Sequence, residues 1–187
     1  MTDSASTTPI PRRLLRGWRA ALVAVLGLTM AFAGATAWLL VWPAQGAPER
    51  VSAVVMLAGT GDRIPVALRL ASQHRAPVLV VSQGHQGYGG PCPPRPSGIK
   101  LICFDPEPAD TRGEAEYIGR LAKQYHWTSM LVVVTRPQAT RARILMGRCF
   151  TGPVYVATAP LPLGSWPYEI AYGWGALVKA ASVHQAC

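Results

Sequence analysis

The sequence predicts an α/β protein: a doubly wound, three-layer sandwich with a mostly parallel sheet, preceded by one N-terminal transmembrane helix. Short runs that are apolar throughout alternate with amphipathic runs at helical spacing. Strands without a polar face are buried between helices, which is the arrangement of a parallel sheet. The span is predicted by Ala20 to Trp42, which carries no charged residue and is longer than the about 20 residues that a membrane-crossing helix needs.

Charge around the apolar stretch predicts its orientation. Arg12, Arg13, Arg16 and Arg19 precede it, and basic residues favour the cytoplasmic side. We therefore expect a single-pass plasma-membrane protein with a cytoplasmic N-terminus. A cleaved secretory signal is the alternative, with a cut near residues 44–47, but the apolar regions of such signals are shorter. The expected parts are a disordered cytoplasmic tail (1–17), the span (18–42), a linker (43–50) and an extracytoplasmic domain (51–187).

The first half of the domain supplies three predicted strands. Val51–Ala58 is an unbroken apolar strand, and Asp62–His74 follows it with apolar residues at helical spacing. Pro77–Val81 reads "PVLVV" and is the second strand. A loop dense in glycine and proline separates it from the third strand, Ile99–Phe104.

The second half alternates helices and strands. Thr111–His126 is predicted as a helix, and Thr111 and Glu114 have the spacing of a capping box, in which each side chain satisfies a free backbone N–H. Ser129–Thr135 is the clearest strand, and Pro137–Arg148 is a helix with proline in its first turn. The last two predicted elements are the strand Pro153–Ala157 and the helix Tyr168–Val183.

All four cysteines lie in the predicted extracytoplasmic domain. An even number in an oxidising compartment predicts disulfides. Cys92 and Cys103 bracket the glycine- and proline-rich loop, so we expect them to pair, which leaves Cys149 with Cys187. The spacing of cysteines and histidines does not suggest a metal site.

The chain is basic, with a formal net charge of +9. A basic exterior suits an anionic partner such as lipid headgroups, wall polymers or phosphorylated substrates. No nucleic-acid motif is recognisable, and we expect no nucleic-acid partner. The expected partners are the lipid membrane, through residues 18–42, and an anionic small molecule or lipid-linked precursor.

Ligands of doubly wound sheets bind beyond the carboxyl ends of the strands, and polar residues gather there in this sequence. Guanidinium groups match phosphate and carboxylate geometry, so the arginines among them predict an anion site. Asp62 is the best candidate for a general base. The two glycines near it equally allow the simpler interpretation of a tight turn between strand and helix. The predicted ligand-binding residues are Gly59, Gly61, Arg63, Ser82, Thr111, Arg112, Thr135, Arg136 and Arg141.

Four segments, in this order and approximate spacing, resemble the YdcF-like family, also called domain of unknown function 218: "AVVMLAGTGDR", "PVLVVSQG", "ADTRGEAEYIGRLA" and "SMLVVVTRPQATRARIL". The resemblance covers roughly residues 51–157. It implies an α/β sandwich, a membrane tether and a role in envelope and peptidoglycan-precursor homeostasis, with no settled reaction. One family member is reported to bind S-adenosylmethionine, so a nucleotide-like ligand is a weaker alternative.

The chain departs from the family pattern at three places. Gln83 replaces the first glycine of a Ser-Gly-Gly turn, Glu114 stands where an asparagine is expected, and a histidine expected at Gln138 or Ala139 is absent. We expect a domain that binds a phosphorylated or anionic envelope metabolite, without a cofactor. Whether it is an enzyme stays open: a phosphate-ester hydrolase or transferase acting on a lipid-linked precursor is one hypothesis, and a non-catalytic regulatory module is the other.

Overall fold

The computed structural model describes residues 12–46, 48–84, 91–183 and 187. Most of the predicted tail, residues 1–11, lies outside them. The chain forms two compact units, Met1–Ala37 and Trp38–Cys187.

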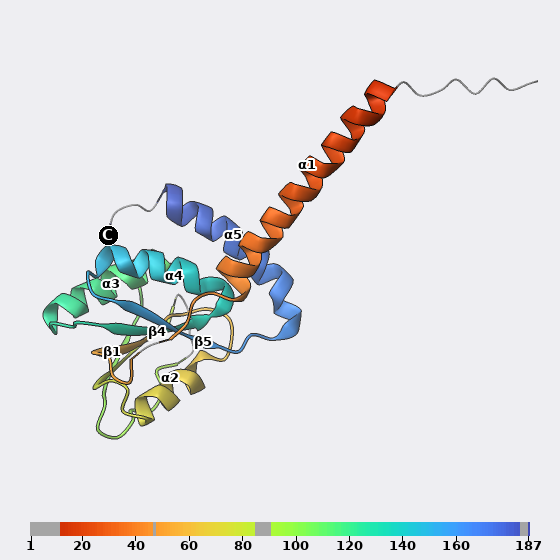
Figure 1. The fold of residues 1–187 in the computed structure, drawn as a ribbon. Coiled ribbons are helices and arrows are strands. Elements are labelled where there is room, and N and C mark those ends of the chain that lie inside the picture. The colour runs from red at the N-terminus through yellow and green to blue at the C-terminus, as the bar shows by residue number, and fades with distance from the viewer. Residues whose placement is uncertain (1–11, 47, 85–90, 184–186) are drawn as a thin grey trace, which may run out of the picture. The chain divides into compact units, whose positions relative to one another are not determined.

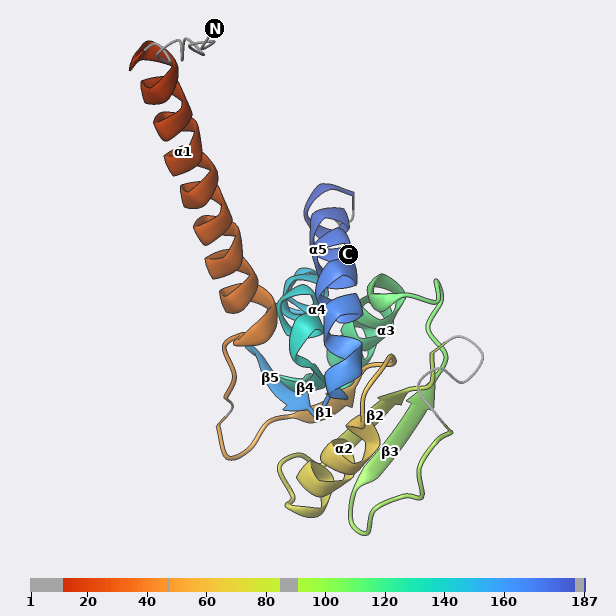
Figure 2. The same ribbon diagram turned by 90° about the vertical axis from the view of Figure 1, so that its right-hand side faces the viewer.

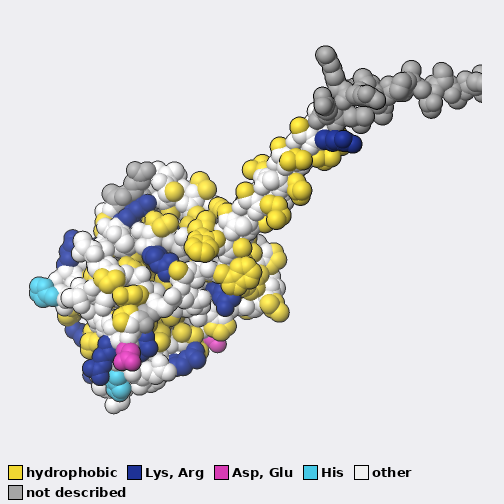
Figure 3. All heavy atoms as spheres, in the orientation of Figure 1, with side chains coloured by type: hydrophobic (Ala, Val, Ile, Leu, Met, Phe, Trp, Pro, Cys, Tyr) yellow, Lys and Arg dark blue, Asp and Glu magenta, His cyan; other side chains and the backbone are white. Residues whose placement is uncertain are grey.

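The first unit is built on the helix α1 (Arg12–Thr36). The π-helical turn η1 (Ala37–Val41) follows α1 and belongs, after Ala37, to the second unit. Gly17–Val41 has a mean hydropathy of 1.9 and is long and apolar enough to cross a membrane. Hydrophobic side chains cover the surface of α1 (Figure 3). The expected apolar N-terminal helix is therefore present, with the length that a span requires.

The second unit contains a five-stranded sheet in which every neighbouring pair of strands is parallel. The strand order is β3-β2-β1-β4-β5; Figure 1 labels β1, β4 and β5, and Figure 2 labels all the strands. This confirms the predicted α/β fold, and the ends of the elements differ from the predicted ones by a few residues. The strands are β1 (Ala53–Met56), β2 (Val78–Ser82), β3 (Lys100–Phe104), β4 (Met130–Thr135) and β5 (Val154–Ala159). The helices are α2 (Arg63–Ser72), α3 (Thr111–Gln124), α4 (Arg136–Cys149), the 3-10 turn η3 (Leu163–Ser165) and α5 (Trp166–Ser182).

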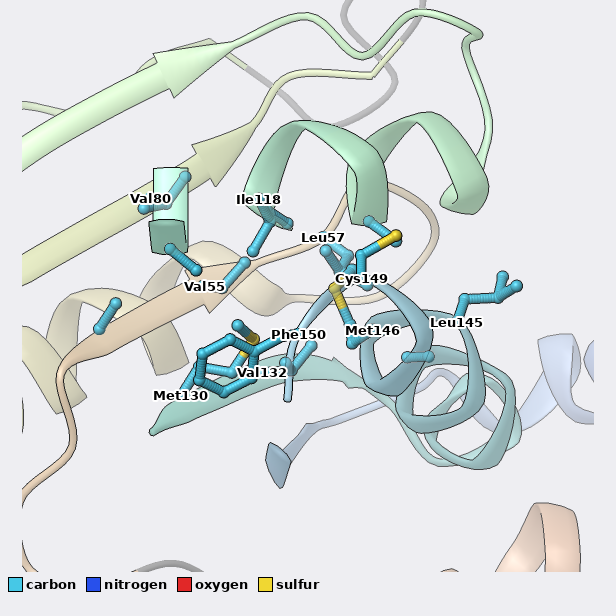
Figure 4. Close-up of a cluster of buried hydrophobic side chains, with 14 of the residues drawn as sticks. Val55, Leu57, Val80, Ile118, Met130, Val132, Leu145, Met146, Cys149 and Phe150 are labelled. Atoms are coloured by element: carbon cyan, nitrogen blue, oxygen red, sulfur yellow. The ribbon is translucent and has the colours of Figure 1, made fainter. Parts of the chain in front are cut away.

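The sheet separates two hydrophobic cores, because alternate side chains of each strand point to opposite faces. On one face, Val54 and its neighbours pack with Val66 of α2. On the other face, Val55, Ile118 of α3 and Met146 of α4 belong to a larger cluster (Figure 4). Helix α5 packs on α4, and α2 lies alone across the sheet (Figure 2). The protein thus has the predicted helix–sheet–helix layers, with α5 added outside α4.

The strand order positions a binding site. Along the chain, β1 connects through α2 to β2 on one side, whereas β4 connects through α4 to β5 on the other. The two connections diverge next to β1 and β4, which makes this the switch point of the sheet. A crevice for ligands forms at the carboxyl ends of the strands at such a point.

The predicted capping box at the start of α3 is wrong. Asp110 is the N-cap residue, and its carboxylate accepts hydrogen bonds from the backbone N–H groups of Arg112 (2.9 Å) and Gly113 (3.0 Å). Thr111 is therefore already the first helical residue. Glu114 turns into the protein and accepts a hydrogen bond from the backbone N–H of Ala58. The aspartate one position earlier supplies the cap, which leaves the glutamate for another role.

Both predicted disulfides are confirmed. Cys92 pairs with Cys103 and Cys149 pairs with Cys187, with Cα–Cα distances of 5.9 and 4.9 Å. The first bond ties the long loop to β3, and the second ties the chain end to the last turn of α4. Among the described residues, neither bond leaves a free cysteine.

Candidate functional site

A cavity of about 720 Å³ lies at the switch point of the sheet, within the second unit. Its walls come from the loop after β1, the first turns of α3, the first half of α4 and one side of α5. The residues that matter below are Gly59, Thr60, Thr111, Arg112, Glu114, Gln138, Arg141, Leu145, Tyr168, Glu169, Tyr172 and Lys179. Cationic, carboxylate and aromatic groups therefore share one cavity.

The backbone of the loop after β1 requires glycine at two positions. Gly59 and Gly61 have φ angles of +129° and +94°, a region that side chains with a Cβ rarely adopt. A Cβ at Gly59 would lie 2.7 Å from Nη2 of Arg63. A Cβ at Gly61 would lie 2.5 Å from Cγ2 of Thr135 and 2.9 Å from the carbonyl oxygen of Pro160. The glycines let this loop turn closely around one arginine.

That arginine, Arg63, is 2% exposed and binds the loop that encloses it. Its Nε donates to the carbonyl oxygen of Thr60 (2.9 Å), and its Nη1 donates to the carbonyl oxygens of Leu57 (2.8 Å) and Ala58 (2.6 Å). Its Nη2 donates to Oε1 of Gln138 (2.7 Å). Burial lowers the pKa of Arg63 to about 10, against the opposing effect of Glu114 and Glu169. The guanidinium therefore stays charged at neutral pH and holds the loop in place.

Glu114 is a buried carboxyl group at the base of the cavity. It is 3% exposed, and its Oε1 accepts from the backbone N–H of Ala58 at 2.7 Å. Burial raises the pKa of Glu114 above its ordinary value, and the Ser82 hydroxyl, the Ala58 N–H and the positive charge of Arg63 act in the opposite direction. Burial thus favours the neutral acid, which can donate a proton.

Glu169 brings a second buried carboxyl group, from the first turn of α5. It is 2% exposed, and its Oε1 accepts from the hydroxyl of Thr60 at 2.5 Å. Its Oε2 is buried and has no hydrogen-bond partner among the described residues. A buried oxygen without a partner costs free energy unless something donates to it. The free oxygen therefore suits a ligand that carries a hydroxyl or amino group.

Arg141 of α4 supplies a cation that the protein leaves incompletely bonded. Its guanidinium carbon lies 5.3 Å from the ring centroid of Tyr172, a cation–π contact. The rings of Tyr172 and Tyr168 stack with centroids 6.1 Å apart. The Nε of Arg141 is buried and has no hydrogen-bond partner in the described part of the chain. Tyr172 therefore holds this guanidinium at the cavity wall, and Nε is left as a donor for an anion.

Two further cations and a hydroxyl line the opening. Arg112 lines the cavity beside Thr111 and forms an exposed ion pair with Glu116 at 2.7 Å. An exposed pair of this kind is worth little, so an anionic ligand can compete for the arginine. Lys179 lines the cavity from α5.

Four of the predicted site residues meet at this cavity: Gly59, Thr111, Arg112 and Arg141. The others lie elsewhere. Arg63 uses its donors within the protein, behind the cavity wall. Ser82 and Thr135 are fully buried at the ends of β2 and β4. Three residues are placed at the starts of helices or in a turn and are absent from the cavity lining: Gly61, Asp62 and Arg136.

Sequence reasoning missed the contribution of α5. Tyr168, Glu169, Tyr172 and Lys179 line the cavity, whereas the pattern of this helix indicated core packing. One signal was available: Glu169 is the single acidic residue in a helix that is otherwise apolar and aromatic apart from Lys179 and Ser182 at its end. An isolated charge in such a helix is costly unless it is bonded or functional.

Comparisons with protein families, curated proteins and solved structures found no match for this chain. Among residues 12–46, 48–84, 91–183 and 187, no group of three histidine, cysteine, aspartate or glutamate side chains could hold a metal ion. The cavity is therefore the feature of the molecule that points to a function.

Proposed function

We propose that this protein is a membrane-anchored, extracytoplasmic domain that binds a phosphorylated or otherwise anionic metabolite of the cell envelope. The observation that carries the proposal is that Arg141 and Glu169 line one cavity, and that each has a buried polar atom without a hydrogen-bond partner among the described residues. Arg141 suits an anionic group, and Glu169 suits a hydroxyl or amino donor. A sugar phosphate, or a lipid that carries one, offers both.

The remaining wall suits the rest of such a ligand. Arg112 and Lys179 add positive charge near the opening, and Thr111 adds a hydroxyl. Leu145, with Tyr168, gives a surface for an apolar or ring-shaped part. Pockets of this kind combine apolar walls with a few polar groups that fix orientation.

The location rests on two features. Gly17–Val41 has the length and hydropathy of a membrane span, and the basic residues before it favour a cytoplasmic N-terminus. Both disulfides lie in the second unit, and structural disulfides persist in oxidising compartments. We therefore place the domain outside the plasma membrane. The resemblance to the YdcF-like family agrees with this location and with a role in envelope homeostasis.

The chemistry of the cavity leaves room for catalysis. A phosphate-ester hydrolase or transferase would need a proton donor and a base, and Glu114 and Glu169 are carboxyl groups at the cavity. Glu114, whose pKa is raised by burial, is the better acid. Glu169, bonded to the Thr60 hydroxyl, is the better base, and it lies in the cavity wall where Asp62 does not.

A non-catalytic regulatory module is the second candidate, and Gln138 favours it. This residue is one of the two positions, with Ala139, where the family pattern has a histidine, and its amide oxygen accepts a hydrogen bond from Arg63. An amide in this role stabilises the loop and cannot take up a proton. A nucleotide-like ligand such as S-adenosylmethionine is a weaker alternative, which direct titration tests.

Titration of the full chain in detergent with a short-chain polyprenyl phosphate tests the proposal. Arg141→Gln should weaken binding by about 1.5–3 kcal/mol, the worth of a hydrogen bond to a charged group. Arg69→Gln removes the same charge from an exposed position on α2 and should leave binding unchanged. Equal affinities of both variants and the unmodified protein would refute the site. Release of inorganic phosphate in the same mixture would distinguish an enzyme from a binding module.

A further inference from the structure

The exposed face of α5 is unusually apolar for a helix that faces solvent. Among the described residues, the helix carries only two charged side chains, and one of these, Glu169, is buried. Val178 is 62% exposed, and Tyr168 and Tyr172 are also exposed. Helices at the surface of a soluble domain normally present polar side chains to water. The exposed side of α5 therefore needs an apolar or interfacial neighbour.

Within the second unit, Leu39 and Leu40 of η1 contact α4 and α5. Leu40 is fully buried, and its Cδ2 lies 3.2 Å from the place where a Cβ on Gly173 of α5 would stand. The hydroxyl of Thr140 in α4 donates to the carbonyl oxygen of Leu39 at 2.5 Å. Gly173 admits the leucine because it has no side chain. Leu40 of η1 and the middle of α5 are therefore packed together inside the second unit.

The composition of the exposed face matches the interfacial region of a bilayer. Tyrosine and tryptophan are enriched where lipid headgroups meet the acyl chains, and lysine extends its charge toward water and phosphate. Tyr168, Tyr172 and Lys179 of α5 are exposed at the rim of the cavity that they line, and the exposed Trp38 and Trp42 flank the segment that holds Leu40. Aromatic rings beside exposed apolar surface favour the interface between membrane and water.

We infer that α5 docks on the membrane that holds the span, with Ala171 and Val178 in the lipid headgroup region. This inference rests on the membrane anchoring proposed above. Because α5 also lines the cavity, docking would bring the cavity to the lipid surface, where it could receive the headgroup of a membrane lipid.

Spin labels on α5 of the full chain in liposomes test the inference. Ala171→Cys and Val178→Cys place labels at two exposed positions seven residues apart, on the same side of the helix. Ser72→Cys is the matched control, because Ser72 is exposed at the end of α2, across the sheet. Mass spectrometry without reduction verifies that both native disulfides remain. Power saturation with oxygen and with an aqueous nickel complex then reports where each label lies.

The labels on α5 should be several-fold less accessible to the nickel complex than the label at position 72, and more accessible to oxygen. Equal access to the nickel complex at all three positions would overturn the inference. Shielding accompanied by dipolar broadening between labels would also overturn it, because a second copy of the chain would then cover the helix. If alkaline carbonate extracts the unmodified chain from the liposomes, both the anchor and the inference fail. If the chain resists extraction but its α5 labels face water, only the inference fails.

Discussion

Arg63→Met removes the buried guanidinium around which the loop after β1 is built. The methionine keeps much of the side-chain length but none of the donors. The carbonyl oxygen of Leu57 and Oε1 of Gln138 lose their bonds in a buried environment, and two carbonyl oxygens in the same loop lose theirs in a partly buried one. Each buried acceptor left without a partner costs about 1–3 kcal/mol.

The two fully buried acceptors alone would cost about 2–6 kcal/mol at that rate. Removal of the charge also relieves the desolvation that lowers the pKa of Arg63, which offsets part of this loss. Breaking a buried charged network by removing one partner typically destabilises a protein by about 3–5 kcal/mol. We therefore expect Arg63→Met to lower the free energy of unfolding of the second unit by about 3–5 kcal/mol.

Urea unfolding of the full chain in detergent, followed by tryptophan fluorescence, measures this loss. Arg69→Met, at an exposed position of α2, is the control and should change stability by less than about 0.5 kcal/mol. Arg63→Lys should recover part of the loss, because a lysine keeps the charge but lacks the planar fork of donors. A loss below about 1 kcal/mol for Arg63→Met would mean that water replaces the guanidinium. The structural role assigned to Arg63 would then be refuted.

Three further predictions use the same unfolding measurement. Burial raises the pKa of Glu114, so the unfolded chain loses this proton at lower pH than the folded protein does. The free energy of unfolding should therefore fall as pH rises above the ordinary glutamate range, and Glu114→Gln should remove that part of the pH dependence. Gly61→Ala should destabilise the second unit by about 1–3 kcal/mol, because φ is +94° and the new Cβ would clash. Gly147 is exposed and has no atom within 4 Å of a new Cβ, so Gly147→Ala should not destabilise the fold, and equal stability of the two variants would contradict the account of the turn. A disulfide stabilises a protein more when it closes a longer loop. Removing the Cys149–Cys187 disulfide, which closes the longer loop, should therefore lower the free energy of unfolding by about 4 kcal/mol, against about 3 kcal/mol for the Cys92–Cys103 disulfide, and the reverse order would contradict this dependence on loop length.

The sheet could be predicted from the sequence because the apolar runs that form its strands are a strong, local signal. Runs such as Met130–Thr135 have no polar face, and only a parallel sheet covered on both sides buries them. The disulfides followed from cysteine number and loop position. The cap of α3 was assigned to the wrong residue because Asp110 and Thr111 are both good N-cap residues, and their spacing to Glu114 does not show which one starts the helix.

The site was harder to predict because it depends on tertiary contacts. The arginines at strand ends were expected to lie together, and Arg112 and Arg141 line the same cavity. It could not show that the donors of Arg63 are taken by the loop around it, since backbone carbonyl groups are invisible in a sequence pattern. The α5 contribution was missed because its apolar residues fit both a buried helix and a cavity wall, and only docking on α4 turns Glu169 inward.

The most direct test of the central claim is native mass spectrometry of the full chain, extracted in mild detergent from membranes of cells that express it. The account predicts a bound, phosphorus-containing species on the unmodified protein and on Arg69→Gln, and its loss from Arg141→Gln, which lacks the guanidinium at the cavity wall. A bound species that is uncharged, or one that Arg141→Gln retains in full, would contradict the claim that this cavity holds an anion.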